Sequence, residues 1–215
     1  MDFVGAYSWP NIKYLLDGFL VTLEVAALSI VFSFVIAIVF AIIRYTKIPV
    51  LSQLVFLWVE MIRNLPLLLI IFFVYFALRD VGIKFEVFTA AVVALTIFES
   101  AMITEIIRSG LMSVDKGQME AARASGLTYV QTLRYIIMPQ ALRRMVPPIV
   151  SQFISLLKDT SLAIIISLAE LMHNGQVIYN TKTNYVIPIL FLIAMMYFVV
   201  NFALSLIARR LEHTR

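Results

Sequence analysis

The sequence predicts an all-α integral membrane protein with five transmembrane helices. Of its 215 residues, 62% are hydrophobic and only 14% are charged, and the mean hydropathy is +0.96, well above the balance of a soluble domain. The apolar residues gather in segments long enough for a helix to cross a hydrocarbon core, which takes about 20 residues. Alternation of apolar and polar residues, typical of membrane-spanning strands, is absent. A bundle of helices is therefore expected.

Five segments have the required length and composition. In chain order, we expect spans over residues 19–43, 54–78, 88–107, 145–168 and 186–207. The second contains Pro66, which lacks the backbone donor that a helix needs and predicts a kink, either static or moving during gating. No segment outside the spans is long enough to fold alone, so residues 1–215 are expected to form a single transmembrane domain.

The basic residues are distributed unequally between the two sides of these spans. One set of loops carries 11 Lys and Arg residues and the other carries 4. The richer set comprises Arg44, Lys47, Arg108, Lys116, Arg123, Arg134, Arg143, Arg144, Arg209, Arg210 and Arg215. Basic residues are retained on the cytoplasmic side, so the amino terminus should be outside and the carboxyl terminus cytoplasmic. The net charge of +4 is then explained by the basic cytoplasmic loops that orient the chain in the bilayer, and no nucleic acid partner is expected.

The polar loop 115–139 is predicted to contain two short helices on the cytoplasmic side. Asp115 precedes Gln118, and Thr128 precedes Gln131, by the three positions of a reciprocal helix cap. Gly126 stands where the first helix should end, because glycine accepts the left-handed conformation that closes a helix. Pro139 cannot donate the bond that would continue the second helix, which should end there.

The first of these helices, expected over 116–125, has a surface that another protein could approach closely. Ala121 and Ala122 are small, and Glu120 and Arg123 supply polar groups beside them. A well-capped connector without a partner is the alternative interpretation.

The loop also contains a family motif. From Glu120 it reads EAARASGLTYVQTLRYIIMP, which resembles the cytoplasmic EAA loop of permease subunits from bacterial ABC importers. The family's usual leucine before the proline is replaced by Met138, an exchange of one apolar residue for another of similar size. The positions that match the motif are Glu120, Ala121, Ala122, Gly126, Ile136 and Pro139.

The resemblance extends over almost the whole chain. The segments EMIRNLPLLLI, FESAMITEIIRSGLMSVDKGQ, MPQALRRMVPPIVSQFISLLKDTSL and SLAELMHNGQ are similar to five-span permeases for polar amino acids, in particular the glutamine and glutamate/aspartate group. The resemblance implies a type I ABC importer permease fold. It also implies a machine of two permease subunits, either copies or homologues, a cytoplasmic ATPase dimer and an extracytoplasmic amino acid-binding protein. The EAA loop would dock on the ATPase, and glutamine is the favoured substrate.

Several other functions are disfavoured by what the sequence lacks. It has no cysteine and only two histidines, so neither a His/Cys metal site nor a cysteine nucleophile is expected. No G-x-x-x-x-G-K-[ST] loop is present, so ATP must be hydrolysed by a partner and the chain itself should be neither an enzyme nor dependent on a cofactor. The alternatives left open are the same machinery with glutamate, aspartate or a basic amino acid as substrate and, more distantly, a passive channel.

Charged residues inside the expected spans are candidates for a substrate site, because ionisable side chains in a bilayer usually face a cavity or a partner. Lys158 could bind the α-carboxylate of an amino acid, and Glu99 or Asp159 its α-ammonium group. Counted along the helices, Lys158 and Glu99 lie at depths that would let them meet. The alternative is that these groups only neutralise one another between spans.

Topology can be tested directly, because the natural chain contains no cysteine. Single cysteines at positions 117 and 181 should react with opposite sidedness: an impermeant thiol reagent applied to intact cells should label 181 and spare 117. Labelling of position 117 from outside would overturn the assignment.

Overall fold

The computed structural model describes residues 1–213, with side chains described through residue 210. Within that range the regular elements are all helical. Arg215, one of the basic residues expected on the cytoplasmic side, lies outside the described residues. In chain order the elements are α1 (Phe3–Ala6), α2 (Trp9–Thr46), α3 (Leu51–Arg63), α4 (Leu67–Phe72), the π-helical turn η1 (Phe73–Ala77), α5 (Leu78–Asp80), α6 (Val87–Met112), α7 (Lys116–Ala124), α8 (Tyr129–Thr132), the π-helical turn η2 (Leu133–Ile137), α9 (Met138–Asp159), the 3-10 helix η3 (Thr160–Ile166), α10 (Leu171–Thr181), the 3-10 turn η4 (Thr183–Tyr185) and α11 (Val186–His213).

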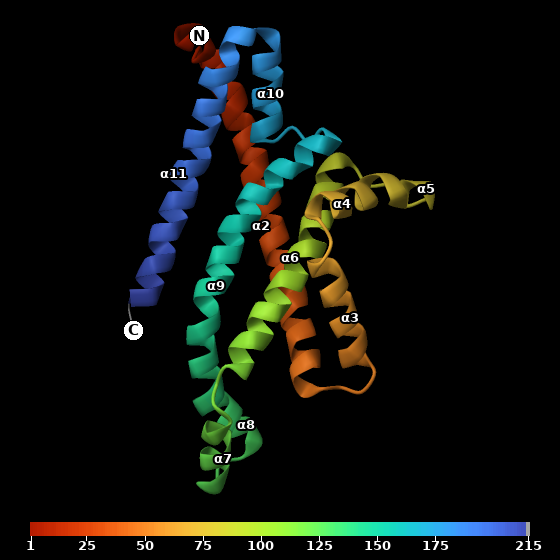
Figure 1. The fold of residues 1–215 in the computed structure, drawn as a ribbon, viewed down its shortest axis with the longest axis vertical. Coiled ribbons are helices and arrows are strands. Elements are labelled where there is room, and N and C mark those ends of the chain that lie inside the picture. Colours follow the sequence, from red (N-terminus) through yellow and green to blue (C-terminus); the bar gives the residue numbers. More distant parts are fainter. Residues whose placement is uncertain (214–215) are drawn as a thin grey trace.

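Four continuous helical segments of the described chain are long and apolar enough to cross a membrane, at Trp9–Thr46, Val87–Met112, Tyr129–Ile166 and Thr183–Arg210. They contain the first, third and fifth expected spans, and the fourth except for its last two residues. Figure 1 shows α1 and α10 at one end of the molecule and α7 and α8 at the opposite end. We call these the α10 end and the α7 end.

The second expected span is broken into two helical pieces. Leu51–Arg63 and Leu67–Asp80 meet at a bend of 105°, so α4 and α5 run sideways from the bundle (Figure 1). Pro66 adopts an extended conformation at the start of α4, and a proline also disfavours the helical conformation of the residue before it. The Asn64 amide donates to the Glu60 carbonyl at 2.7 Å, which caps the end of α3. The expected kink is therefore a full break, and five spans result when the bent pair is counted as one.

Pro139 does not end a helix, contrary to the sequence-based expectation. The helix continues from Tyr129 to Ile166, and Pro139 is the second residue of α9. The π-helical turn η2 directly precedes α9. The wider i→i+5 hydrogen bonding of η2 alters the backbone register just before Pro139, which has no backbone N–H to donate. The Gln140 side chain donates to the Ile136 carbonyl at 2.9 Å, which satisfies one acceptor in this irregular stretch.

The central helix of the bundle is α6, which packs against α2, α3, α4 and α9. It contributes small buried residues such as Ala90, Ala94 and Ala101, which allow close helix approach in a membrane, where the hydrophobic effect supplies little attraction between helices. A Cβ atom added at Gly110 would lie 2.8 Å from the Met145 Cβ atom. The half of α6 nearer the α7 end therefore contacts α9 at a distance that only glycine permits.

At the α10 end, a polar cluster joins α2 to α10. The Thr22 hydroxyl accepts from the Leu171 backbone N–H at 3.2 Å, and the Asn174 amide donates to the Tyr14 carbonyl at 2.8 Å. The Glu170 carboxylate accepts from the backbone N–H groups of Met172 and His173 at the start of α10. These bonds hold the irregular segment after η3 against the first span.

Candidate functional site

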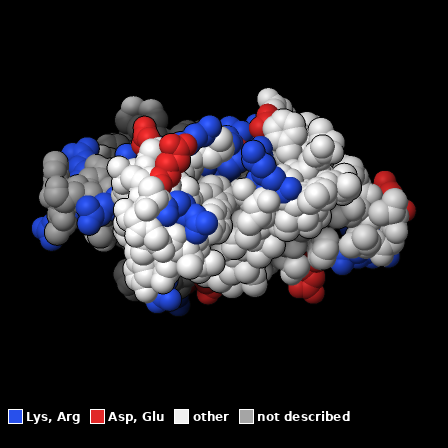
Figure 2. All heavy atoms as spheres, turned by 90° about the horizontal axis from the view of Figure 1, so that it is seen from below, with Lys and Arg blue, Asp and Glu red and all other residues white. Residues whose placement is uncertain are grey.

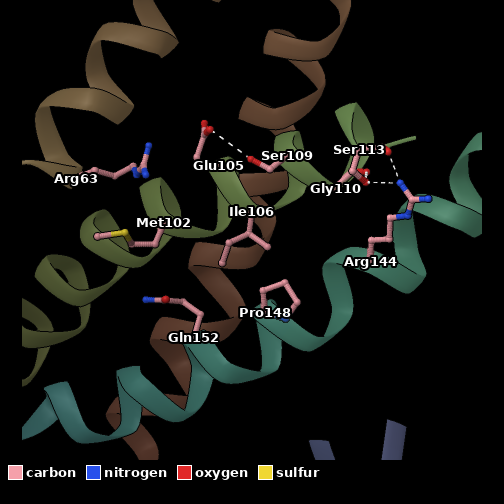
Figure 3. Close-up of a pocket in the computed structure, with 10 residues that line it drawn as sticks. All are labelled: Arg63, Met102, Glu105, Ile106, Ser109, Gly110, Ser113, Arg144, Pro148 and Gln152. Carbon is pink, nitrogen blue, oxygen red and sulfur yellow. Dashed lines mark hydrogen bonds between the residues drawn. The ribbon is translucent and has the colours of Figure 1, made fainter. Parts of the chain in front are cut away.

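A polar cavity of about 390 Å³ lies between α6 and α9 and reaches the last residue of α3. Figure 3 shows side chains from these helices around it. The lining residues are Arg63, Met102, Glu105, Ile106, Ser109, Gly110, Ser113, Arg144, Pro148 and Gln152.

Helix periodicity explains why these residues share the cavity. On α6 and its C-cap residue the lining positions run from Met102 to Ser113 in alternating steps of three and one, and on α9 they are Arg144, Pro148 and Gln152, each four residues apart. Residues three and four apart lie on one face of a helix. The cavity is therefore the space between two facing helix surfaces, and it carries cationic, anionic and neutral polar side chains.

The charged groups of this cavity are tied into fixed positions. The Glu105 carboxylate pairs with Arg108 on its own helix and with the Arg44 Nη1 atom of α2 at 2.9 Å. Arg63 pairs with Glu60 at 3.1 Å, and Arg144 donates to the carbonyl and hydroxyl groups of Ser113. The two intrahelical pairs join residues three positions apart, whereas the partnership of Arg44 with Glu105 joins residues 61 positions apart.

Glu99 lies deeper in the bundle and is connected to the cavity through Gln152. Its side chain is fully buried, at 0% exposure, and its Oε2 atom accepts from the Gln152 Nε2 atom at 3.1 Å. Its Oε1 atom has no hydrogen-bond partner among the described residues. A buried carboxylate oxygen without a partner is energetically costly. Glu99 is therefore placed to accept a hydrogen bond from a donor that enters the bundle.

The structure separates the other two candidate substrate residues. Asp159 is half-buried, whereas Lys158 is exposed and, in the described part of the chain, forms no ion pair with Glu99. The physical reason is helical phase. Asp159 follows Gln152 by seven residues and shares its face, whereas Lys158 follows by six and points elsewhere. Sequence reasoning missed Gln152, which that seven-residue spacing from Asp159 could have indicated.

The loop at the α7 end has rigid boundaries. Thr128 and Gln131 form a reciprocal capping box at the start of α8. Gly126 has a φ of +88°, and the Gly126 N–H and Leu127 N–H donate to the Arg123 and Ala122 carbonyls at 3.1 and 3.2 Å, which is a Schellman closure of α7. At the other end of α7, Asp115 accepts from the Gly117 N–H at 2.6 Å, so the helix begins as expected but with the Asp115 carboxylate on Gly117 rather than Gln118.

The sequence predicts that both Ala121 and Ala122 lie on the open surface of α7, and the structure differs at Ala122. Glu120 and Ala121 are exposed, whereas Ala122 is only 8% exposed, because α7 packs against α8 and η2 on that side. Pro139 is exposed on the following helix. Three apolar or aromatic side chains of this loop region are also exposed, which sequence reasoning did not single out: Tyr129, Val130 and Tyr135.

The described side chains hold no group of three or more His, Cys, Asp or Glu residues placed to bind a metal ion. The arrangement instead offers a buried carboxylate connected through Gln152 to the cavity between α6 and α9, together with a capped helix at one end of the molecule. That combination suits a membrane protein that moves a polar solute and contacts a partner protein at its α7 end.

Comparisons with known proteins agree with this arrangement. The chain is 64% identical to the probable glutamine ABC transporter permease protein GlnP of Bacillus subtilis strain 168, over 99% of this chain and 98% of that protein. It is 40% identical to the probable glutamine ABC transporter permease protein GlnM of the same strain, over 95% and 94% of the two chains. A crystal structure of an amino acid ABC transporter with histidines contains a chain that is 30% identical and superposes with a TM-score of 0.93, over 100% of this chain and 99% of that one.

The family described as the inner membrane component of binding-protein-dependent transport systems matches residues 29–214, which is most of the chain. The protein therefore belongs to this family of multi-pass membrane permeases.

Proposed function

We propose that this chain is the permease subunit of an ATP-driven importer that moves glutamine into the cell. The observation that carries the proposal is the hydrogen bond between the buried Glu99 and Gln152, which connects a carboxylate within the bundle to the cavity between α6 and α9. The names of the relatives from Bacillus subtilis support glutamine as the substrate. The working complex would contain a second permease subunit, either a copy or a homologue, a cytoplasmic ATPase dimer and an extracytoplasmic amino acid-binding protein.

The α-ammonium group and the side-chain amide of glutamine each have a complementary group along this path, whereas the α-carboxylate would depend on Lys158, which lies on another face of α9. The α-ammonium group would donate to the unpartnered Oε1 atom of Glu99, with Asp159 as a second acceptor. Gln152 would exchange its bond to Glu99 for bonds to the side-chain amide of the substrate. In this assignment Lys158 binds the α-carboxylate once a second permease subunit encloses its exposed side chain. The two carboxylates would also suit a substrate with a cationic side chain, so a basic amino acid is the second candidate.

The α7 end is proposed to be cytoplasmic, with residues 1–215 acting as one transmembrane domain and 115–139 as its coupling loop. Figure 2 looks onto this end, where Lys and Arg side chains predominate over Asp and Glu. Such an excess favours the cytoplasmic side. The amino terminus, at the α10 end in Figure 1, would then face outward.

Coupling to the ATPase is assigned to the motif residues of this loop. Glu120 and Ala121 lie on the exposed side of α7 and would contact the ATPase directly, while Pro139 is exposed beside the loop. Ala122 and Gly126 would act by holding the loop in shape, because Ala122 is buried within it and Gly126 closes the helix with a positive φ. Movement of the ATPase subunits could then reach α6 and α9, which flank the loop in the chain.

The proposed function predicts a specific transport behaviour. In proteoliposomes that contain the complete complex, uptake of labelled glutamine should stop when ATP is omitted, and excess unlabelled glutamine should suppress it more strongly than glutamate, aspartate or arginine. Uptake that persists without ATP would instead identify a channel, and stronger suppression by arginine would identify the basic amino acid as the substrate.

The substrate path predicts the effect of Glu99→Gln. This change keeps an acceptor for Gln152 and removes the charge, so it should weaken glutamine uptake by roughly 10-fold or more, because a hydrogen bond to a charged group contributes about 1.5–3 kcal/mol. Lys158→Met, which retains the apolar stem, should also lower the uptake rate. Co-purification of the ATPase reports assembly. Wild-type uptake by an assembled Lys158→Met complex would exclude Lys158 from the site, and the same result for Glu99→Gln would exclude Glu99.

The coupling loop predicts different outcomes at two adjacent alanines. Ala121→Trp adds bulk on the exposed side and should abolish stimulated ATP hydrolysis and uptake while the permease itself stays as stable as the wild type. Ala122→Trp adds the same bulk at a buried position and should lower the thermal stability of the chain itself, since overpacking costs about 1–3 kcal/mol.

The matched control for this pair is Ala121→Ser, which stays small and should retain both activities. Gly126→Val should behave like Ala122→Trp, because a β-branched residue disfavours a positive φ. Wild-type ATPase stimulation in Ala121→Trp would show that the outer side of α7 is not the contact.

A further inference from the structure

A second cavity with polar side chains, of about 460 Å³, lies toward the α7 end between α2, α3 and α6, and it shares no lining residue with the α6/α9 cavity. The residues that matter for its chemistry are Arg44, Lys47 and Arg108, with Ser52, Gln53 and Phe56 beside them. Its size falls within the range of about 300–1,000 Å³ that holds small ligands or headgroups.

The cavity carries an uncompensated positive charge. One carboxylate, Glu105, pairs with both Arg44 and Arg108, and Lys47 adds a third cation on the cavity wall. One negative charge against three positive charges leaves a net charge of two. The cavity is therefore complementary to an anion rather than to a neutral or cationic group.

The two guanidinium groups are held in place before any ligand binds. The Arg44 side chain is only 12% exposed, and its Cζ atom lies 5.0 Å from the centre of the Phe56 ring. Arg108 bonds to Glu105 through its Nε and Nη2 atoms. Planar guanidinium groups that are fixed in this way suit the oxygen atoms of a phosphate.

The depth of the cavity indicates where the anion comes from. It lies where three helices begin or end, because α2 ends at Thr46, α3 begins at Leu51 and α6 ends at Met112. Helix ends of membrane spans lie at the level of the lipid headgroups. The surface next to it exposes large apolar side chains that suit acyl chains: Ile48, Val50, Leu51 and Leu54.

We propose that this cavity binds the headgroup of an anionic phospholipid. The phosphate would contact Arg44, Lys47 and Arg108, the hydroxyl groups of the headgroup would bond to Ser52 and Gln53, and the acyl chains would lie along the exposed apolar residues of the α2–α3 turn. A zwitterionic lipid fits less well, because its own cationic group would compete with the basic side chains. Basic pockets between membrane helices on the cytoplasmic side bind anionic headgroups in this way.

Lys47→Gln provides the test, because this side chain is exposed and lies outside the Arg44–Glu105–Arg108 network. The full-length chain is purified in detergent and titrated with phosphatidylglycerol or phosphatidylcholine, and bound lipid is counted by native mass spectrometry. Wild-type protein should retain phosphatidylglycerol preferentially. Lys47→Gln should weaken that retention about fivefold, since a basic residue near an anionic lipid surface contributes about 1 kcal/mol.

Lys116→Gln is the matched control, because it removes the same charge from an exposed position on α7 outside the cavity, and its lipid retention should equal that of the wild type. Gln53→Ala, a neutral change in the cavity wall, should weaken retention even if Lys47→Gln proves unstable. Equal retention of the two lipids, or equal effects of Lys47→Gln and Lys116→Gln, would overturn the proposal. Displacement of the lipid by millimolar inorganic phosphate would also overturn it, by identifying a soluble anion as the ligand.

Discussion

Hydrocarbon offers no hydrogen-bond partner to a polypeptide, and the whole architecture depends on that constraint. Each backbone group in the bilayer must be satisfied inside the protein, which favours uninterrupted helices. Where this chain departs from a helix, side chains supply the missing partners. Asn64 caps the end of α3 before the break at Pro66, and the Glu170 carboxylate accepts two backbone N–H groups where the chain resumes as α10.

The same constraint makes polar groups between α6 and α9 energetically costly unless they find a hydrogen-bond partner. A buried carboxylate is retained in a membrane protein when it is paired or when it serves a solute, and one oxygen of Glu99 is left without a partner. By contrast, both oxygens of Glu105 are occupied by the guanidinium groups of Arg44 and Arg108. Two acidic residues on one helix thus differ in their partners, since both oxygens of Glu105 are bonded to guanidinium groups and one oxygen of Glu99 is left for a further donor.

Helix α6 connects these sites to the α7 end. Its last residues include Gly110, which permits close contact with Met145. Ser113, the residue directly after the end of α6, accepts hydrogen bonds from Arg144. Asp115 then starts α7 two residues later. The helix surface that lines the polar cavity is therefore bonded to α9 next to the loop that is proposed to meet the ATPase, so a displacement of that loop would be transmitted to both walls of the cavity.

The sequence alone determined the helical class, the approximate spans, the closure at Gly126 and the capping box at Thr128, because apolar periodicity and capping depend on residues close together in the chain. It also contained the motifs that identify the family. Only the tertiary structure decided the 105° break at Pro66, the continuation of the helix through Pro139 and the burial of Ala122. Likewise, Gln152 approaches Glu99 across 53 residues and Arg44 approaches Glu105 across 61. These contacts depend on which helix faces meet when distant segments pack, and no local pattern specifies that choice.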